Sequence, residues 1–242
     1  SREEEMSAMK SEFIANVSHE IKTPIATIRT LAENLNEGWV TGHEQQQEYF
    51  HLIEREAERL THLVENILDF SRIERARRTY RMELASIEEA TRKAIGRFRL
   101  LVDGQGVVIK ENIESNLPPC PLDVEAYEQA LLNLLDNAVK YSRDEKVVEV
   151  SARRQKDSIV VAVADGGVGI SKADSERIFD KFFRSPLPDG RKIPGSGIGL
   201  TLVKEIIEAH AGTIAVDSEI GRGSTFTLSF PLPNDSAKRS VG

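Results

Sequence analysis

The sequence has little of what defines several common classes of protein. It has one cysteine, Cys120, which excludes an intrachain disulfide and favours a reducing compartment. Acidic residues outnumber basic ones by 39 to 32. The resulting net charge of −7 excludes a basic field that wraps nucleic acid, leaving at most a local patch, and we expect no nucleic-acid partner. No apolar run approaches the roughly 20 residues that cross a bilayer.

The overall composition is that of a folded protein. Hydrophobic residues make up 40% and charged residues 29% of the 242 residues, which excludes wholesale disorder and fits one or two domains. The N-terminal Ser1 to Glu5 lacks the pattern of a signal peptide and is typical of the inside of a longer helix. We therefore expect the chain to be a fragment.

The first third of the chain shows the periodicity of two long helices. Apolar residues recur at alternating spacings of three and four from Met6 to Leu35 and again from Phe50 to Ile67, with a hairpin loop at residues 36–42. Two helices cannot bury such stripes alone, so we predict a four-helix bundle made by two chains. A monomeric hairpin lying on a second domain is the alternative.

The pattern changes to mixed α/β after an arginine-rich linker at residues 74–80. Ser86 and Asp123 are typical helix N-caps. We predict helices beginning at these two residues and a third at residues 201–211. Strands are expected at residues 107–113, 147–152, 159–164, 213–216 and 224–230, and a rigid turn at residues 117–121.

A histidine on the first helix stands among residues suited to chemistry. His19 lies about 200° around the helix from the apolar residues on either side, so it should face solvent. Glu20 can fix the tautomer of a neighbouring imidazole, and Thr23 lies one turn further on the same face as His19. Pro24 removes a helical hydrogen bond and favours a kink. The alternative is a capped, kinked helix without chemistry.

A second polar cluster follows the helix predicted at residues 123–141. Asn133, Asn137, Lys140 and Tyr141 fall on one face of this helix, although asparagine is a poor interior helix residue. An amide oxygen suits Mg²⁺, and Lys140 suits a phosphate. A solvated polar face is the alternative.

Three glycine-rich segments complete the pattern. Asp165 opens residues 165–170, at the end of a predicted buried strand, where a carboxylate can accept the exocyclic amine of adenine. Residues 195–200 open a helix, whose free amides form an anion site, and follow a cationic, proline-rich stretch at residues 184–194 that is typical of a mobile lid. Residues 221–226 join the last two strands. Taken singly, each segment is equally compatible with a plain turn.

Together and in this order, the motifs resemble the cytoplasmic core of bacterial sensor histidine kinases of two-component systems. The resemblance runs from about Met6 to Pro233. Residues 18–24 look like the H box, 133–141 the N box, 165–170 the first glycine box, 178–184 the F box, 195–200 the second glycine box and 221–226 a third.

The resemblance implies specific roles. His19 corresponds to the phospho-acceptor, Glu20 to the base, and Thr23 to the residue that positions water for removing phosphate from a response regulator. Asn137 corresponds to the Mg²⁺ ligand and Asp165 to the residue that reads adenine. The remaining residues expected at the ATP site are Asn133, Lys140, Tyr141, Gly167, Gly169, Ile170, Lys181, Arg184, Gly195, Ser196, Gly197, Gly199, Leu200 and Thr225.

The resemblance also implies an architecture and partners. Residues 1–77 would form the dimerising, phospho-accepting hairpin. Residues 78–232 would form a two-layer α/β sandwich that binds ATP, of the kind shared with gyrase and certain chaperones, and residues 233–242 a disordered tail. The partners would be a second copy and the receiver domain of a response regulator. The chain would be cytoplasmic, attached to a membrane only through other parts of its parent.

Two other functions remain to be weighed. An ATP hydrolase of the gyrase and chaperone kind would, by the resemblance, carry a water-activating glutamate where this chain has Asn133. A dimerisation module with a decayed ATP site would not need Asn137, Asp165 and the glycine boxes to be intact. The departures from the family pattern, at Gly166 and Ala211, touch no expected catalytic role.

Overall fold

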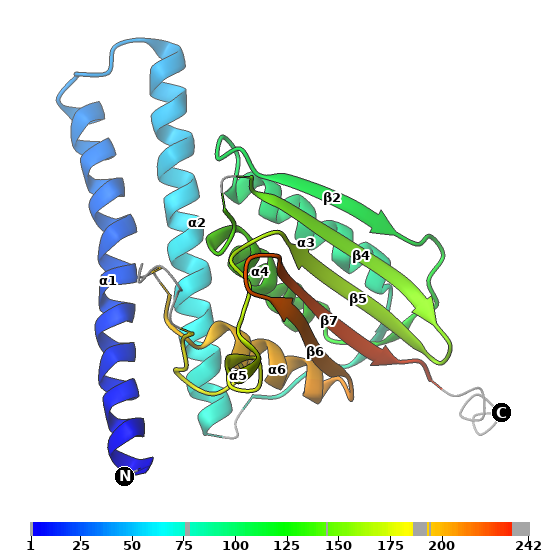
Figure 1. The fold of residues 1–242 in the computed structure, drawn as a ribbon. Coiled ribbons are helices and arrows are strands. Elements are labelled where there is room, and N and C mark those ends of the chain that lie inside the picture. The colour runs from blue at the N-terminus through cyan, green and yellow to red at the C-terminus, as the bar shows by residue number, and fades with distance from the viewer. Residues whose placement is uncertain (1, 76–77, 144, 186–192, 194, 234–242) are drawn as a thin grey trace.

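The computed structural model describes residues 2–75, 78–143, 145–185, 193 and 195–233. Helices α1 (Arg2–Asn36) and α2 (His43–Glu74) form the predicted antiparallel hairpin, and α2 lies beside the rest of the chain (Figure 1). Pro24 lies inside α1 without ending it. Among the described helices, none is both long and apolar enough to cross a membrane.

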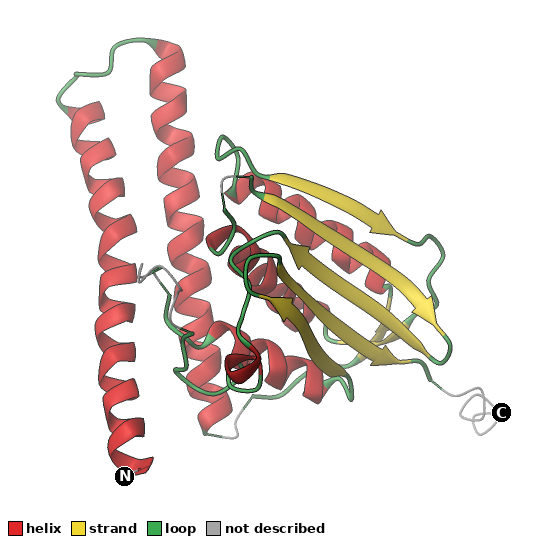
Figure 2. Cartoon of the chain, in the orientation of Figure 1, coloured by secondary structure: helices red, strands yellow, loops and turns green. Residues whose placement is uncertain are grey.

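The second part is a five-stranded sheet covered on one face by helices (Figure 2). The strand order is β2-β4-β5-β7-β6, in which only the β2–β4 pair is parallel. This arrangement confirms the predicted two-layer α/β sandwich. The strands are β2 (Val108–Ile113), β4 (Val147–Gln155), β5 (Ser158–Asp165), β6 (Thr213–Glu219) and β7 (Gly223–Pro231), and the covering helices are α3 (Ile87–Leu101), α4 (Val124–Lys140) and α6 (Gly199–Ala209).

Local signals in the sequence account for the ends of α3 and α4. The Ser86 hydroxyl accepts a hydrogen bond from the Glu89 amide at 3.2 Å, and the Asp123 carboxylate accepts one from the Ala126 amide at 3.0 Å. Each cap satisfies an amide that the first helical turn leaves without a partner. Both predicted N-caps are therefore confirmed.

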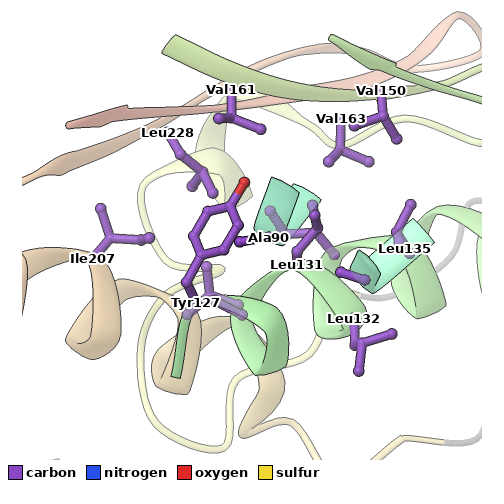
Figure 3. Packing of buried hydrophobic residues seen from close by; sticks show 14 of the residues in the cluster. Ala90, Tyr127, Leu131, Leu132, Leu135, Val150, Val161, Val163, Ile207 and Leu228 are labelled. Carbon is purple, nitrogen blue, oxygen red and sulfur yellow. The ribbon is translucent and has the colours of Figure 1, made fainter. Parts of the chain in front are cut away.

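The core lies between the sheet and its helices (Figure 3). Along β5, Ile159, Val161 and Val163 are buried and alternate with more exposed residues, as expected for a strand covered on one face. The ring of Tyr127 points from α4 toward the sheet, and its hydroxyl lies 2.6 Å from that of Thr91. This hydrogen bond gives the buried phenol a polar partner. Burial raises the pKa of Tyr127.

Three features differ from the sequence prediction. The turn expected at residues 117–121 ends in a short strand, β3 (Cys120–Leu122), which pairs with the unpredicted β1 (Glu83–Ala85). A one-turn helix, α5 (Lys172–Ser175), was not predicted. The helix expected at residues 201–211 is α6, which begins earlier, at Gly199. The disordered tail expected at residues 233–242 lies, apart from Pro233, outside the described residues.

Candidate functional site

A cavity opens at the end of β5, between α4, the loop after β5 and the segment that leads into α6. Asp165 is the last residue of β5 and pairs in register with Ser224 of β7. The cavity brings together ten of the predicted site residues, namely Asn137, Tyr141, Asp165, Gly169, Ile170, Arg184, Gly195, Gly197, Gly199 and Leu200.

The carboxylate of Asp165 is held in a fixed orientation. The Gly167 amide donates a hydrogen bond to its Oδ1 at 2.8 Å. Burial raises the pKa of Asp165, and the backbone amides of Gly167 and Ser224 partly offset this rise. The result is a half-buried acceptor on the cavity wall, suited to a neutral donor such as an amine.

Helix α4 contributes Asn137, and Tyr141 is the C-cap residue of this helix, one turn further along. Within the described part of the chain, no hydrogen bond to the side-chain amide of Asn137 is present, so its oxygen is available to a ligand. Burial raises the pKa of Tyr141, while the positive charges of Arg184 and Lys140 oppose the rise. Of these two cations, Arg184 lines the cavity.

The glycine-rich segment before α6 lies against the F box. The Phe182 amide donates to the carbonyl of Gly197 at 3.1 Å, and the Arg184 guanidinium donates to the carbonyl of Ile193. Gly199 and Leu200, in the first turn of α6, line the cavity, so the free backbone amides of this turn favour an anion there. Most of the predicted lid, residues 186–192 and 194, lies outside the described residues.

The three candidate catalytic residues lie on α1, with different surroundings. His19 is exposed, as predicted, and Thr23 donates its hydroxyl to the carbonyl of His19 at 3.1 Å. Glu20 is half-buried and faces a second cavity of about 210 Å³, which Lys140 and Ser196 also line. Its buried Oε1 has no hydrogen-bond partner among the described residues. His19 itself does not line either cavity.

Lys140 connects the two halves of the molecule electrostatically. Burial lowers its pKa, but the carboxylates of Asp136 and Glu20 outweigh burial and raise the pKa above its ordinary value. Its ammonium lies 2.7 Å from Asp136. Lys140 thus stays charged and lies on the cavity shared with the H box rather than on the wall of the first cavity.

Five further predicted residues do not line the first cavity. Asn133 is buried against α2, and Ser196 faces the second cavity. Lys181 pairs with Glu74 of α2 at 3.5 Å. Gly167 packs so closely that a Cβ would lie 2.3 Å from the carbonyl oxygen of Tyr141. Thr225 is absent from the wall because strand side chains alternate, so its neighbours Ser224 and Phe226 face the cavity instead.

Sequence reasoning missed six residues of the wall. Two signals in the sequence could have found some of them. Strand alternation along β7 would have indicated Ser224 and Phe226, and the first glycine box includes Val168. Ser185 is held by a 2.7 Å hydrogen bond that it donates to Asp174, a contact with no local signature. The missed residues are Val168, Ile178, Phe183, Ser185, Ser224 and Phe226.

The F box also contacts the hairpin. The ring of Phe182 lies 4.8 Å from that of Phe13 on α1 and 5.4 Å from that of Phe70 on α2, measured between centroids. These are favourable aromatic distances. The backbone amide of Phe182 is also hydrogen-bonded to Gly197. Phe182 therefore contacts both the hairpin and the glycine-rich segment.

Gly223 supports the cavity through a close backbone approach. Its φ is +104°, and a Cβ there would lie 1.9 Å from the carbonyl oxygen of Asp165. We expect Gly223→Ala to lower the free energy of unfolding by roughly 2–4 kcal/mol, through backbone strain and overpacking. Urea denaturation measures this, with Gly166→Ala as the control because open space surrounds that glycine. Equal stability of the two variants would contradict this close contact between Gly223 and Asp165.

Comparisons with known proteins agree with this geometry. Residues 9–76 match the family model of the His Kinase A (phospho-acceptor) domain, and residues 122–234 match that of the histidine kinase-, DNA gyrase B- and HSP90-like ATPase. These two matches define the class: a hairpin of the His Kinase A family joined to a domain of the histidine kinase-, DNA gyrase B- and HSP90-like ATPase family. The chain belongs to the sensor histidine kinases of bacterial two-component systems.

Individual relatives cover nearly the whole chain. The sensor-like histidine kinase SenX3 of Mycobacterium tuberculosis is 37% identical over 226 residues, which are 93% of this chain and 55% of SenX3. Histidine kinase AdeS of Acinetobacter baumannii matches with a TM-score of 0.59 and 26% identity, covering 89% of this chain and 98% of AdeS. Full-length ShkA in complex with AMPPNP matches with a TM-score of 0.62 and 27% identity, covering 91% of this chain and 45% of ShkA. The chain thus spans about half the length of SenX3.

Proposed function

We propose that this protein autophosphorylates at His19 with the γ-phosphoryl group of Mg·ATP, within one chain or between the two chains of a dimer, and then passes that group to an aspartate of a response regulator. The observation that carries the proposal is the cavity in which Glu20 of the H box faces Lys140 of the N box, next to the Asp165 cavity. Gly199 lines both cavities, so the two are neighbours. Incubation with γ-labelled ATP tests the proposal, because label should enter the chain and then move to a receiver domain.

The first cavity supports binding of ATP. Asp165 would accept the exocyclic amine of adenine, while the free amides at the start of α6 and the Arg184 guanidinium would bind the phosphates. Asn137 fits a magnesium ion, because its hard amide oxygen has no other partner among the described residues and Mg²⁺ takes most of its ligands from phosphate and water. When bound, the ion would neutralise phosphate charge.

The transfer step uses the exposed imidazole. A neutral nitrogen of His19 would attack the γ-phosphorus while the bond from that phosphorus to the bridging oxygen breaks, and ADP leaves. The carboxylate of Glu20 would take the imidazole proton. Phosphoryl transfer depends mainly on positioning and on stabilisation of charge, and Lys140 would supply a positive charge from the shared cavity.

The gyrase-type alternative is disfavoured by the match of residues 9–76 to a phospho-acceptor domain.

The hairpin surface supports pairing with a second copy. Large apolar side chains that a single chain leaves exposed recur along both helices, which is unusual for a free surface. They are Ile14, Ile25, Phe50, Val64 and Leu68. A four-helix bundle would cover them, with residues 1–77 as the dimerising domain and residues 78–232 as the ATP-binding domain.

The remaining assignments rest on the family. A receiver domain as phosphoryl acceptor, a water-positioning role for Thr23 in removing that phosphate, and a cytoplasmic place within a membrane-bound sensor are expectations for the parent protein. In this structure the Thr23 hydroxyl already donates to the carbonyl of His19. Its oxygen keeps lone pairs that could accept a hydrogen bond from a water.

Replacing Asp165 tests the nucleotide assignment. We expect Asp165→Ala to bind ATP about 10- to 100-fold more weakly, the loss typical of a hydrogen bond to a charged group. Because guanine presents a carbonyl where adenine presents the amine, the variant should also lose its preference for ATP over GTP. Calorimetric titration with both nucleotides measures this. Asp157→Ala, at the other end of the β4–β5 hairpin, is the control, and unchanged selectivity would refute the assignment.

A further inference from the structure

A pair of buried asparagines joins the ATP-binding domain to the hairpin, in addition to the contacts of Phe182 and Lys181. Asn66 of α2 donates through Nδ2 to Oδ1 of Asn133 at 2.8 Å, and Asn133 donates through Nδ2 to Oδ1 of Asn66 at 3.2 Å. Their exposed fractions are only 7% and 5%. Each amide thus satisfies the other, away from water, across an interface between segments 67 residues apart.

A wider polar cluster surrounds this pair. The Gln129 amide donates to Asn66 Oδ1 and to Asp69 Oδ2, each at 3.0 Å, and Arg78 donates to Gln129 Oε1 at 2.8 Å. Nε2 of His62 lies 3.3 Å from Nδ2 of Asn66. The residues of α2 recur at spacings of three and four, so they form one face of that helix. A buried polar network that is well satisfied fixes geometry more strictly than apolar packing does.

The pair turns the side chain of Asn133 away from the Asp165 cavity. Both polar atoms of its side chain are used by Asn66, and it does not line the Asp165 cavity. Asn137, one turn further along α4, lines that cavity and has no such partner among the described residues. Asn133 and Asn137 therefore have different roles, although they lie on the same face of α4.

We propose that Asn66 and Asn133 form a docking pair that positions the ATP-binding domain over the H box for phosphoryl transfer. The inference rests on the proposed function. Beside the pair, the second cavity is lined by Glu20 from α1 and by Lys140 and Ser196 from the ATP-binding domain. Asn66 and Asn133 line the same cavity, so the pair holds the two motifs at a fixed separation. Asn66 is a positioning residue, and Asn133 positions the domain instead of binding nucleotide.

The test compares affinity with rate in Asn66→Ala, Asn133→Ala and the double variant of the full chain. We expect unchanged ATP affinity by calorimetry and a roughly 5- to 30-fold slower autophosphorylation at saturating ATP in each variant, the size of a typical coupling between contacting residues. The double variant should be no slower than either single one. Thr61→Ala, on the exposed side of α2, should match the wild type.

Other outcomes would overturn the proposal. Weaker ATP binding in Asn133→Ala, with Asn66→Ala silent, would make Asn133 a nucleotide ligand. Faster labelling in either variant would mean that the pair holds an inactive arrangement. Should alanine unfold the chain, Asn66→Asp, which still accepts from Asn133 but no longer donates, must label more slowly than the wild type; a wild-type rate would refute the pair.

A second measurement is independent of catalysis. Small-angle scattering of the full chain should show a larger radius of gyration for Asn66→Ala than for the wild type, because the contacts that remain, those of Phe182 and Lys181, would hold the domain for a smaller share of the time. An unchanged radius would refute docking by this pair. If the wild type takes no label at all, the proposed function fails, yet the scattering result still decides whether the pair docks the domain.

Discussion

Replacing Asn137 by alanine is expected to leave a folded chain that is about 100- to 1,000-fold slower in autophosphorylation, the usual cost of removing one electrostatic contact to a transferring group. The amide oxygen of Asn137 lies on the wall of the Asp165 cavity without a partner among the described residues. Its loss removes the protein ligand expected for Mg²⁺. Alanine is the better helix former, so the fold should not suffer.

The measurement is the rate of labelling at saturating Mg·ATP, together with thermal unfolding. Asn133→Ala is the matched comparison: it removes the same side chain one turn away on α4, and it should slow labelling only by the roughly 5- to 30-fold expected from loss of docking. If Asn137→Ala labels at the wild-type rate while remaining folded, the magnesium assignment is wrong. If it unfolds, the conclusion that its side chain is free of structural contacts is wrong.

Much of the fold follows from local patterns. The apolar stripes predicted the hairpin, and the N-caps Ser86 and Asp123 predicted the starts of α3 and α4. Alternation predicted the strands that build the sheet. The motifs also predicted the positions of Asn137 and Asp165 on one cavity, because glycine-rich turns and strand ends leave short-range signals.

What could not be predicted depends on contacts between distant segments. The β1–β3 pair joins two three-residue strands too short to show a period. Nothing local distinguishes Asn133 from Asn137, which lie on the same helix face. Their surroundings differ because Asn66 of α2 lies against Asn133 and forms a hydrogen bond with it. In the same way, the partner of Lys181 is Glu74 on the hairpin.

The largest expected effect concerns His19. Its imidazole is exposed on α1, and nothing described in the chain blocks access to it, so a ring nitrogen is accessible to a phosphoryl donor. We expect His19→Gln to lose all labelling, because glutamine has no comparable nucleophile, while ATP affinity stays unchanged because His19 does not line the Asp165 cavity.

Labelling with γ-labelled ATP, followed by acid and alkali treatment, tests the central claim most directly. The wild type should carry label that is lost in acid and survives alkali, as phosphohistidine does, and His19→Gln should carry none while still binding ATP. Acid-stable label in the wild type, or full labelling of His19→Gln, would contradict the account.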